Sequence, residues 1–177
     1  MELRIGSELL YSHVSQNDQI NSNFKLSQIS IGGKYQFTNK TNPAFSLAVI
    51  TNLLYHFKKT SSYKSKISPE LILAFDKDLS ETFSIGINIG SKLGSEDETF
   101  QFFYSVSTGI KLLDRLTSYI EISEELNSNA EPINLVNGGF LLLITSNFQL
   151  DTSTGVQLIK TDSHWFINTG FSLRLFN

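Results

Sequence analysis

The chain has 177 residues, of which 40% are hydrophobic and 18% are charged, and this balance excludes a disordered protein. The 14 basic and 17 acidic residues give a net charge of −3, which argues against a nucleic-acid-binding protein, because such a protein needs a basic surface. The absence of cysteine excludes disulfide scaffolds, thiolate metal sites and cysteine nucleophiles.

The start of the chain, MELRIGSELLYS, lacks a basic segment followed by an apolar core, so no signal peptide is visible, and we expect that one was removed or truncated. The longest apolar runs, such as residues 140–144, fall far short of the roughly 18 residues that a membrane-spanning helix needs. A helical membrane protein is therefore excluded. A transmembrane β-barrel is not excluded, because half of each of its strands is polar.

Alternation of apolar and polar residues with a period of two predicts β-strands along the whole chain. In chain order, the alternation is clearest at 45–55, 83–90, 100–111, 149–158 and 165–175. Between residues 133 and 144 the alternation changes phase near Gly138 and Gly139, which predicts a β-bulge there.

Clusters rich in Asn, Asp, Ser, Gly and Lys predict the turns between these strands. The clusters lie at 16–23, 39–43, 58–66, 76–81, 91–98, 113–115, 127–132, 146–147 and 161–163. They divide the chain into about ten strands that are joined only by hairpins. The sequence therefore predicts an all-β fold with a single domain over residues 1–177, an antiparallel up-and-down barrel.

Two features favour a transmembrane barrel over a soluble one. The predicted turns alternate between long and short, apart from the last, and long loops at one end are typical of outer-membrane barrels. Aromatic residues on the apolar face also gather near the strand ends, as the two interfacial girdles of a transmembrane barrel do. The predicted girdle residues are Tyr11, Tyr35, Phe37, Phe45, Tyr55, Phe75, Phe83, Phe100 and Trp165.

The polar face of the strands carries many charges. So many charges cannot form a dry core, because unpaired buried charges are costly. They are expected to line a water-filled lumen or to pair across a narrow one, and in a soluble fold they would face bulk solvent. The predicted lumen residues are Arg4, Glu8, Lys34, Glu70, Lys111, Glu121, Asp151 and Arg174. We expect Arg174 to contact Glu121 or Asp151 and to set the constriction.

Five segments carry a family resemblance: ELRIGSELL at 2–10, ISIGGKYQF at 29–37, LTSYIEIS at 116–123, NFQLDTSTGV at 147–156 and WFINTGFSLRL at 165–175. They resemble the transporter-like outer-membrane barrel family that is named for the MetA pathway of phenol degradation. The resemblance implies a bacterial outer-membrane location and passage of small, often hydrophobic molecules. It also implies further strands before residue 2, so a larger barrel, of which this chain would be a part, is kept as an alternative. It places inward polar residues at Lys34, Glu121, Asp151 and Arg174.

Candidate catalytic chemistry is sparse. His13, His56 and His164 all fall near predicted long loops, and Asp162 and Ser163 precede the last of them. Adjacent residues in a turn seldom bring a nucleophile and its base into hydrogen-bond geometry, so the prediction is a solvated rim and no enzyme. No metal site and no cofactor are expected, because neither a three-histidine site nor a phosphate-binding glycine motif is supported.

One predicted loop is basic. Lys58, Lys59, Lys64 and Lys66 could hold lipopolysaccharide phosphates as point charges, or they could pair with the acidic residues 96–98. Solvated loop charge is the simpler interpretation.

The main functional expectation is a passive outer-membrane channel or transporter for small molecules, hydrophobic ones included. Two alternatives stay open. The first is a non-conducting barrel that anchors or docks a partner, and it predicts a plugged lumen instead of a continuous water path. The second is a soluble ligand-binding barrel, in which the apolar face would point inward.

Overall fold

The computed structural model describes residues 1–16, 19–38, 45–57, 67–94, 99–126, 132–158 and 163–175, with the backbone alone at 10–16, 19–25 and 163–164. Ten antiparallel strands make up this part of the chain. They are β1 Glu2–Gln16, β2 Gln19–Gln36, β3 Ser46–His56, β4 Ile67–Asp78, β5 Phe83–Leu93, β6 Phe100–Leu113, β7 Leu116–Leu126, β8 Ile133–Leu143, β9 Phe148–Leu158 and β10 Ser163–Arg174. No helix in the described ranges is both long and apolar enough to cross a membrane.

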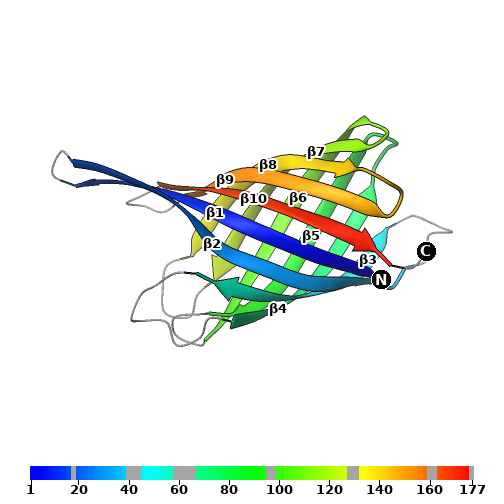
Figure 1. Ribbon diagram of the computed structural model, residues 1–177. Helices are drawn as coiled ribbons and strands as arrows, with labels where there is room; N and C mark the ends of the chain where they lie inside the picture. Colours follow the sequence, from blue (N-terminus) through cyan, green and yellow to red (C-terminus); the bar gives the residue numbers. More distant parts are fainter. Residues whose placement is uncertain are drawn as a thin grey trace.

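The strands close into a barrel, as the sequence predicts (Figure 1). Each strand pairs with its neighbours in the chain, and β1 pairs with β10 along a seam that runs from Glu2–Arg174 to Ser12–His164. Next to the Glu2–Arg174 end of this seam, the Leu175 backbone nitrogen donates a hydrogen bond of 3.0 Å to the Met1 carbonyl oxygen. Closure leaves no open sheet edge in the wall, which is the condition for a β-structure to reside in lipid.

The first hairpin is longer than the sequence indicates. β1 runs to Gln16 and β2 begins at Gln19, so the predicted loop at 16–23 is wrong. Pairing between β2 and β3 begins only at Gln28, so residues 19–26 pair with β1 alone. This two-stranded ribbon projects beyond the barrel wall (Figure 1). A strand that leaves the barrel loses the apolar alternation, and its polar residues then look like those of a turn.

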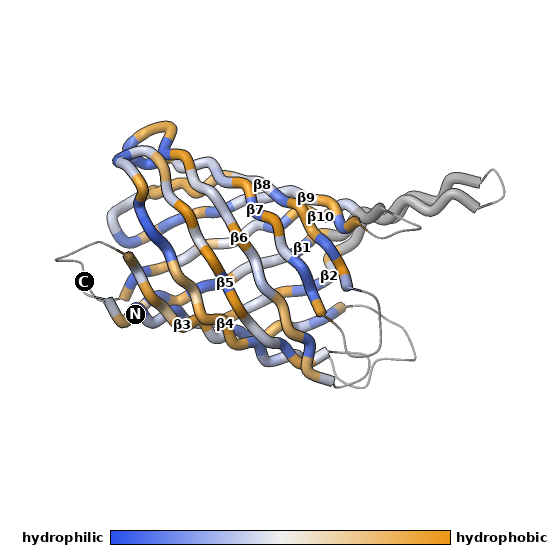
Figure 2. The backbone as a smooth tube through the Cα atoms, turned by 180° about the vertical axis from the view of Figure 1, so that it is seen from behind, coloured by the Kyte–Doolittle hydropathy of each residue, from blue (hydrophilic) through white to orange (hydrophobic). Residues whose placement is uncertain are grey.

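Apolar side chains cover the outside of the barrel. Ile89, Ile120 and Ile122 are each more than 60% exposed. Ala74, which is almost fully buried, lines the interior, and the fully buried Ala48 lies directly opposite it on β3 and faces the same side. Figure 2 shows hydrophobic and hydrophilic positions alternating along the strands. A soluble protein does not expose apolar surface on this scale, so this arrangement is the reverse of a soluble ligand-binding barrel and excludes that alternative.

The predicted girdle residues with described side chains lie on this outer face. All of them are exposed apart from Phe75, which is partly exposed. The exposed ones are Tyr35, Phe37, Phe45, Tyr55, Phe83, Phe100 and Trp165. Phe75 stacks on Phe45 with ring centroids 5.5 Å apart. The side chain of Tyr11 and the predicted turns at 39–43 and 58–66 lie outside the described residues.

The β-bulge predicted in β8 is wrong. Gly138 pairs with Ile120 and Thr154, and Gly139 continues the same register with no shift. The phase change in the sequence arises because Leu135 and Leu141 point into the barrel, so β8 carries apolar residues on both faces. The two register shifts in the described ladders lie instead at residues 8–9 of β1 and 111–113 of β6.

Candidate functional site

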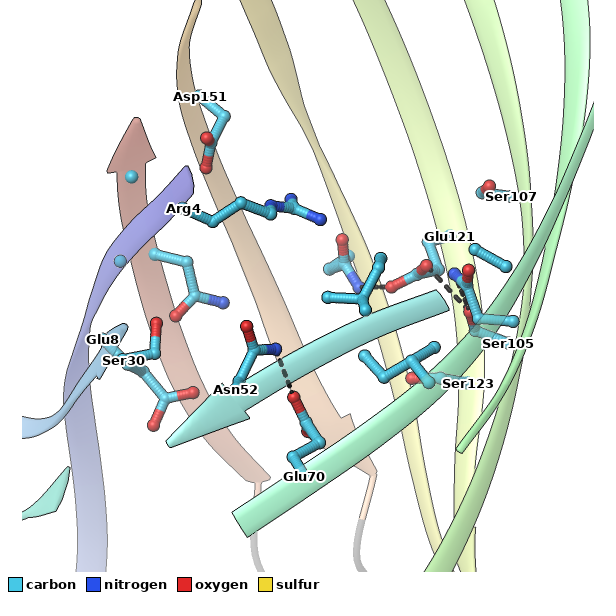
Figure 3. Close-up of a pocket in the computed structure, with 18 of the residues that line it drawn as sticks. Arg4, Glu8, Ser30, Asn52, Glu70, Ser105, Ser107, Glu121, Ser123 and Asp151 are labelled. Atoms are coloured by element: carbon cyan, nitrogen blue, oxygen red, sulfur yellow. Dashed lines mark hydrogen bonds between the residues drawn. The ribbon is translucent and has the colours of Figure 1, made fainter. Parts of the chain in front are cut away.

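A cavity of about 740 Å³ lies inside the barrel, and inward side chains from all ten strands line it. Its walls are mainly polar, as the close-up in Figure 3 shows. The inward positions are set by the strand alternation, because every second residue of a strand faces the same side. We call this cavity the lumen.

Six of the eight predicted lumen residues line this cavity: Arg4, Glu8, Lys34, Glu70, Glu121 and Asp151. Lys111 and Arg174 are not among the lining residues. The Lys111 Nζ atom lies 3.0 Å from an Asp114 carboxylate oxygen in the exposed turn between β6 and β7.

The expected pairing of Arg174 with Glu121 or Asp151 is wrong. The ion pairs of the described residues do not include Arg174, which sits opposite Glu2 at the end of the β1–β10 seam. Arg4 takes the place that was expected for Arg174. It extends into the lumen from β1 and is close enough to Asp151 on β9 for direct electrostatic attraction (Figure 3).

Several polar lumen residues were missed by the sequence prediction. Asp76 and Lys92 fall in the predicted turns at 76–81 and 91–98, although they continue the inward phase of β4 and β5. Glu125 is two positions beyond Ser123 on the inward face of β7 and was available from the same alternation. The strands extend further than their turn-like composition indicates, so the lumen holds more charge than expected.

Neutral donors hold three of the lumen carboxylates. The Ser27 hydroxyl of β2 donates to the Glu8 carboxylate of β1. The Asn52 Nδ2 atom donates to Glu70 Oε2 at 2.6 Å, between β3 and β4 (Figure 3). Glu121 accepts at both of its oxygens, from Asn137 Nδ2 at 3.0 Å and from Ser105 Oγ at 2.9 Å. These contacts join adjacent strands and fix the carboxylates against the wall.

Cations hold two further carboxylates. Lys92 Nζ lies 2.6 Å from Glu125 Oε1, and Lys34 Nζ lies 3.8 Å from Asp76 Oδ2. Each pair joins strands that are two apart in the barrel order. These ion pairs therefore also run along the wall and do not reach across the lumen.

One part of the lumen wall is apolar. Ala48 and Ile50 of β3 and Ala74 of β4 form a buried cluster, and the partly buried Ile72 packs against it. These side chains face the same interior as the carboxylates. Ile50, Ile72 and Ala74 are among the lining residues, so the lumen wall includes apolar as well as charged side chains.

Two inward aromatic rings lie over glycines of the neighbouring strand. An added Cβ at Gly90 would come within 2.3 Å of the Phe103 ring, and one at Gly155 would come within 2.5 Å of the Phe166 ring. A glycine at such a site leaves room for an aromatic side chain to lie flat against the sheet. The two rings therefore lie close to the wall. Rings that projected from the wall would narrow the lumen.

The remaining candidates carry little chemistry. His56 Nε2 lies 3.1 Å from Ser68 Oγ, while the side chains of His13 and His164 and all of Asp162 lie outside the described residues. Within the described ranges no three His, Asp or Glu residues are arranged to hold a metal ion. The four loop lysines at 58, 59, 64 and 66 also lie outside the described part of the chain.

A closed barrel with an apolar exterior and a polar lumen defines a transmembrane β-barrel of the outer-membrane type. The family model described as "Putative MetA-pathway of phenol degradation" matches residues 2–175, and the chain belongs to that family. The search of curated proteins gave no match.

Solved structures share this fold at low sequence identity. An outer-membrane channel from Pseudomonas putida F1 superposes with a TM-score of 0.63 at 10% identity, covering 97% of this chain and 94% of that one. The KdgM porin gives a TM-score of 0.58 at 10% identity, covering 99% of this chain and 100% of that one. The CymD monoaromatic hydrocarbon channel gives 0.51 at 8% identity, covering 99% of this chain and 88% of that one.

Proposed function

We propose that this protein is a passive channel of the bacterial outer membrane through which small solutes cross, and that it is not an enzyme. The observation that carries the proposal is the polar cavity of about 740 Å³ inside a barrel whose outside is apolar. A polar interior enclosed by lipid has to be hydrated, because unsatisfied polar groups in an apolar medium are costly.

The contacts of the lumen side chains support an open path. The hydrogen bonds and ion pairs described above join strands that are one or two apart, so they run along the wall. A plugged barrel would instead have contacts between opposite walls. The apolar cluster around Ile50 is compatible with solutes that have a hydrophobic part.

The structural comparisons agree with a channel. KdgM has been solved in complex with disordered oligogalacturonate, and CymD is described as a monoaromatic hydrocarbon channel. The two solutes differ in polarity, so the shared fold supports passage of small molecules and does not select one. The same proposal includes two contacts with lipid. The outer face contacts the bilayer, and lipopolysaccharide phosphates bind at Lys58, Lys59, Lys64 and Lys66.

Insertion into planar lipid bilayers tests the proposal directly. Purified protein that migrates as a folded barrel before heating should give discrete current steps in potassium chloride. A folded and inserted protein that gives no current under any salt or voltage would contradict a channel. That result would favour a barrel that anchors or docks a partner.

A further inference from the structure

The charged residues that line the lumen are mostly acidic. The lining carboxylates are Glu8, Glu70, Asp76, Glu121, Glu125 and Asp151, and the lining cations are Arg4, Lys34 and Lys92. Six negative charges against three positive ones leave a net negative wall. This imbalance is local, because it concerns only the side chains that a passing solute meets.

Ion pairing further reduces the positive charge that a solute can meet in the lumen. Lys92 is committed to Glu125 and Lys34 faces Asp76, so two of the three cations are paired with carboxylates. Arg4 is the remaining lining cation, and it interacts with Asp151 and lies 3.9 Å from Glu2. Glu8, Glu70 and Glu121 have no cation within ion-pairing distance among the described residues.

The surroundings of Glu70 and Glu121 keep their charge available to a solute. Their partners Asn52, Asn137 and Ser105 are neutral donors, which orient a carboxylate. Neutral donors do not cancel the charge as a lysine would. Both residues line the cavity, one on β4 and the other on β7.

A lumen enclosed by lipid concentrates the effect of wall charges, because clefts with low-dielectric walls focus the electric field. Rings of carboxylates are the usual basis of cation preference in channels. Resting on the proposed channel function, we propose that the lumen admits small cations in preference to anions, and that Glu70 and Glu121 determine this preference. The preferred solutes are inorganic cations and organic ammonium compounds, and carboxylates and phosphates are disfavoured.

Reversal potentials across a gradient of potassium chloride test this inference. The wild-type channel should be more permeable to potassium than to chloride at about 0.1 M salt, and the preference should weaken near 1 M, where the screening length falls to about 3 Å. Glu70→Gln and Glu121→Gln keep the side-chain shape and remove the charge. Each should lower the permeability ratio by up to about fivefold, the equivalent of a unit charge acting at about 4 Å in water.

A matched control lies on the same strand. Glu124 is three residues from Glu121, is not a lining residue, and accepts a hydrogen bond from the outward Tyr104 hydroxyl. Glu124→Gln makes the same change in net charge outside the lumen and should leave the permeability ratio unchanged. An equal effect of Glu124→Gln and Glu121→Gln would overturn the assignment of the preference to the lumen wall.

The outcomes separate the two proposals. Wild-type channels that conduct but pass chloride as well as or better than potassium would overturn the cation preference and leave the channel intact. This result needs no variant, so poor folding of the glutamine variants cannot obscure it. Wild-type protein that inserts without conducting overturns both proposals.

Discussion

Arg4 on β1 extends into the lumen beside Asp151 on β9, although the two residues are separated by β10 in the barrel wall. Arg4 is the one lining cation that is not held by a lumen carboxylate at ion-pairing distance in the described part of the chain. Its guanidinium is therefore the positive group that a solute meets in a mainly acidic lumen. We infer that Arg4 limits the width and the charge of the path at this level.

Truncation of Arg4 should widen the path. Arg4→Ala should raise the single-channel conductance and increase the preference for potassium over chloride by up to about fivefold, because one positive charge is lost. Arg174→Ala is the matched control, because Arg174 is not among the lining residues. Equal conductance changes in the two variants would show that Arg4 does not limit the path.

The outer face should tolerate charge according to depth. Ile89 is 61% exposed in the middle of β5, and Phe83 is 37% exposed at the start of the same strand. Ile89→Arg should lower the free energy of unfolding by about 2–4 kcal/mol, and Phe83→Arg by at most about 1 kcal/mol. Denaturant titration of protein folded into vesicles measures both values. If the two substitutions cost the same, the placement of the bilayer around β5 is wrong.

The contact between Gly90 and Phe103 should couple the two positions. Gly90→Val places a side chain within the Phe103 ring and should cost roughly 1–3 kcal/mol of stability, as overpacking does. Adding Phe103→Ala should recover part of the loss, because an added Cβ at Gly90 also comes within 2.9 Å of the Leu71 carbonyl oxygen. This non-additivity in a double-mutant cycle is the test. Gly33→Val is the control, because an added Cβ there meets only a backbone oxygen at 3.6 Å. Additive effects at Gly90 and Phe103 would contradict the contact.

The β1–β10 seam should be detectable by crosslinking. The chain has no cysteine, so Glu2→Cys together with Arg174→Cys introduces a single pair at directly opposed positions. Oxidation of the folded protein should give an intramolecular disulfide and a shifted band on a non-reducing gel, because opposed Cβ atoms lie about 4.5–5.5 Å apart. Glu2→Cys with Asp114→Cys, in the turn between β6 and β7, should give no such band. Equal yields from the two pairs would argue against the seam.

The sequence predicted the architecture of this protein more completely than its lumen. The alternation of apolar and polar residues identified ten strands and the outward face, because a transmembrane strand that exposes one face to lipid and the other to water imprints this pattern. The pattern failed where a strand does not have one apolar face toward lipid and one polar face toward water. The ribbon formed by residues 13–16 and 19–26 projects beyond the wall, and β8 places Leu135 and Leu141 inside the lumen.

The partners of individual lumen residues could not be predicted from the sequence. The expectation that Arg174 lies near Glu121 and Asp151 rests on their similar distances from the turns. It assumes that the strands run parallel to the barrel axis. Strands in a closed barrel are tilted and staggered, so positions equally far from a turn lie at different heights. The stagger brings Arg4 beside Asp151 and leaves Arg174 at the end of the seam. The amount of stagger depends on the whole barrel and is not encoded in any one strand.

The seam also determines the order in which the barrel can assemble. Nine of the ten strand pairings join consecutive strands, whereas the seam joins residues as far apart as Glu2 and Arg174. By loop-closure entropy, the seam costs roughly 2–3 kcal/mol more to form than a single hairpin, so it should form last. Until then β1 and β10 are two free edges with unpaired backbone groups, and each can pair with another chain. The slow and aggregation-prone step of folding is therefore concentrated in one ladder, and stabilising that ladder should speed closure more than the same gain elsewhere in the wall.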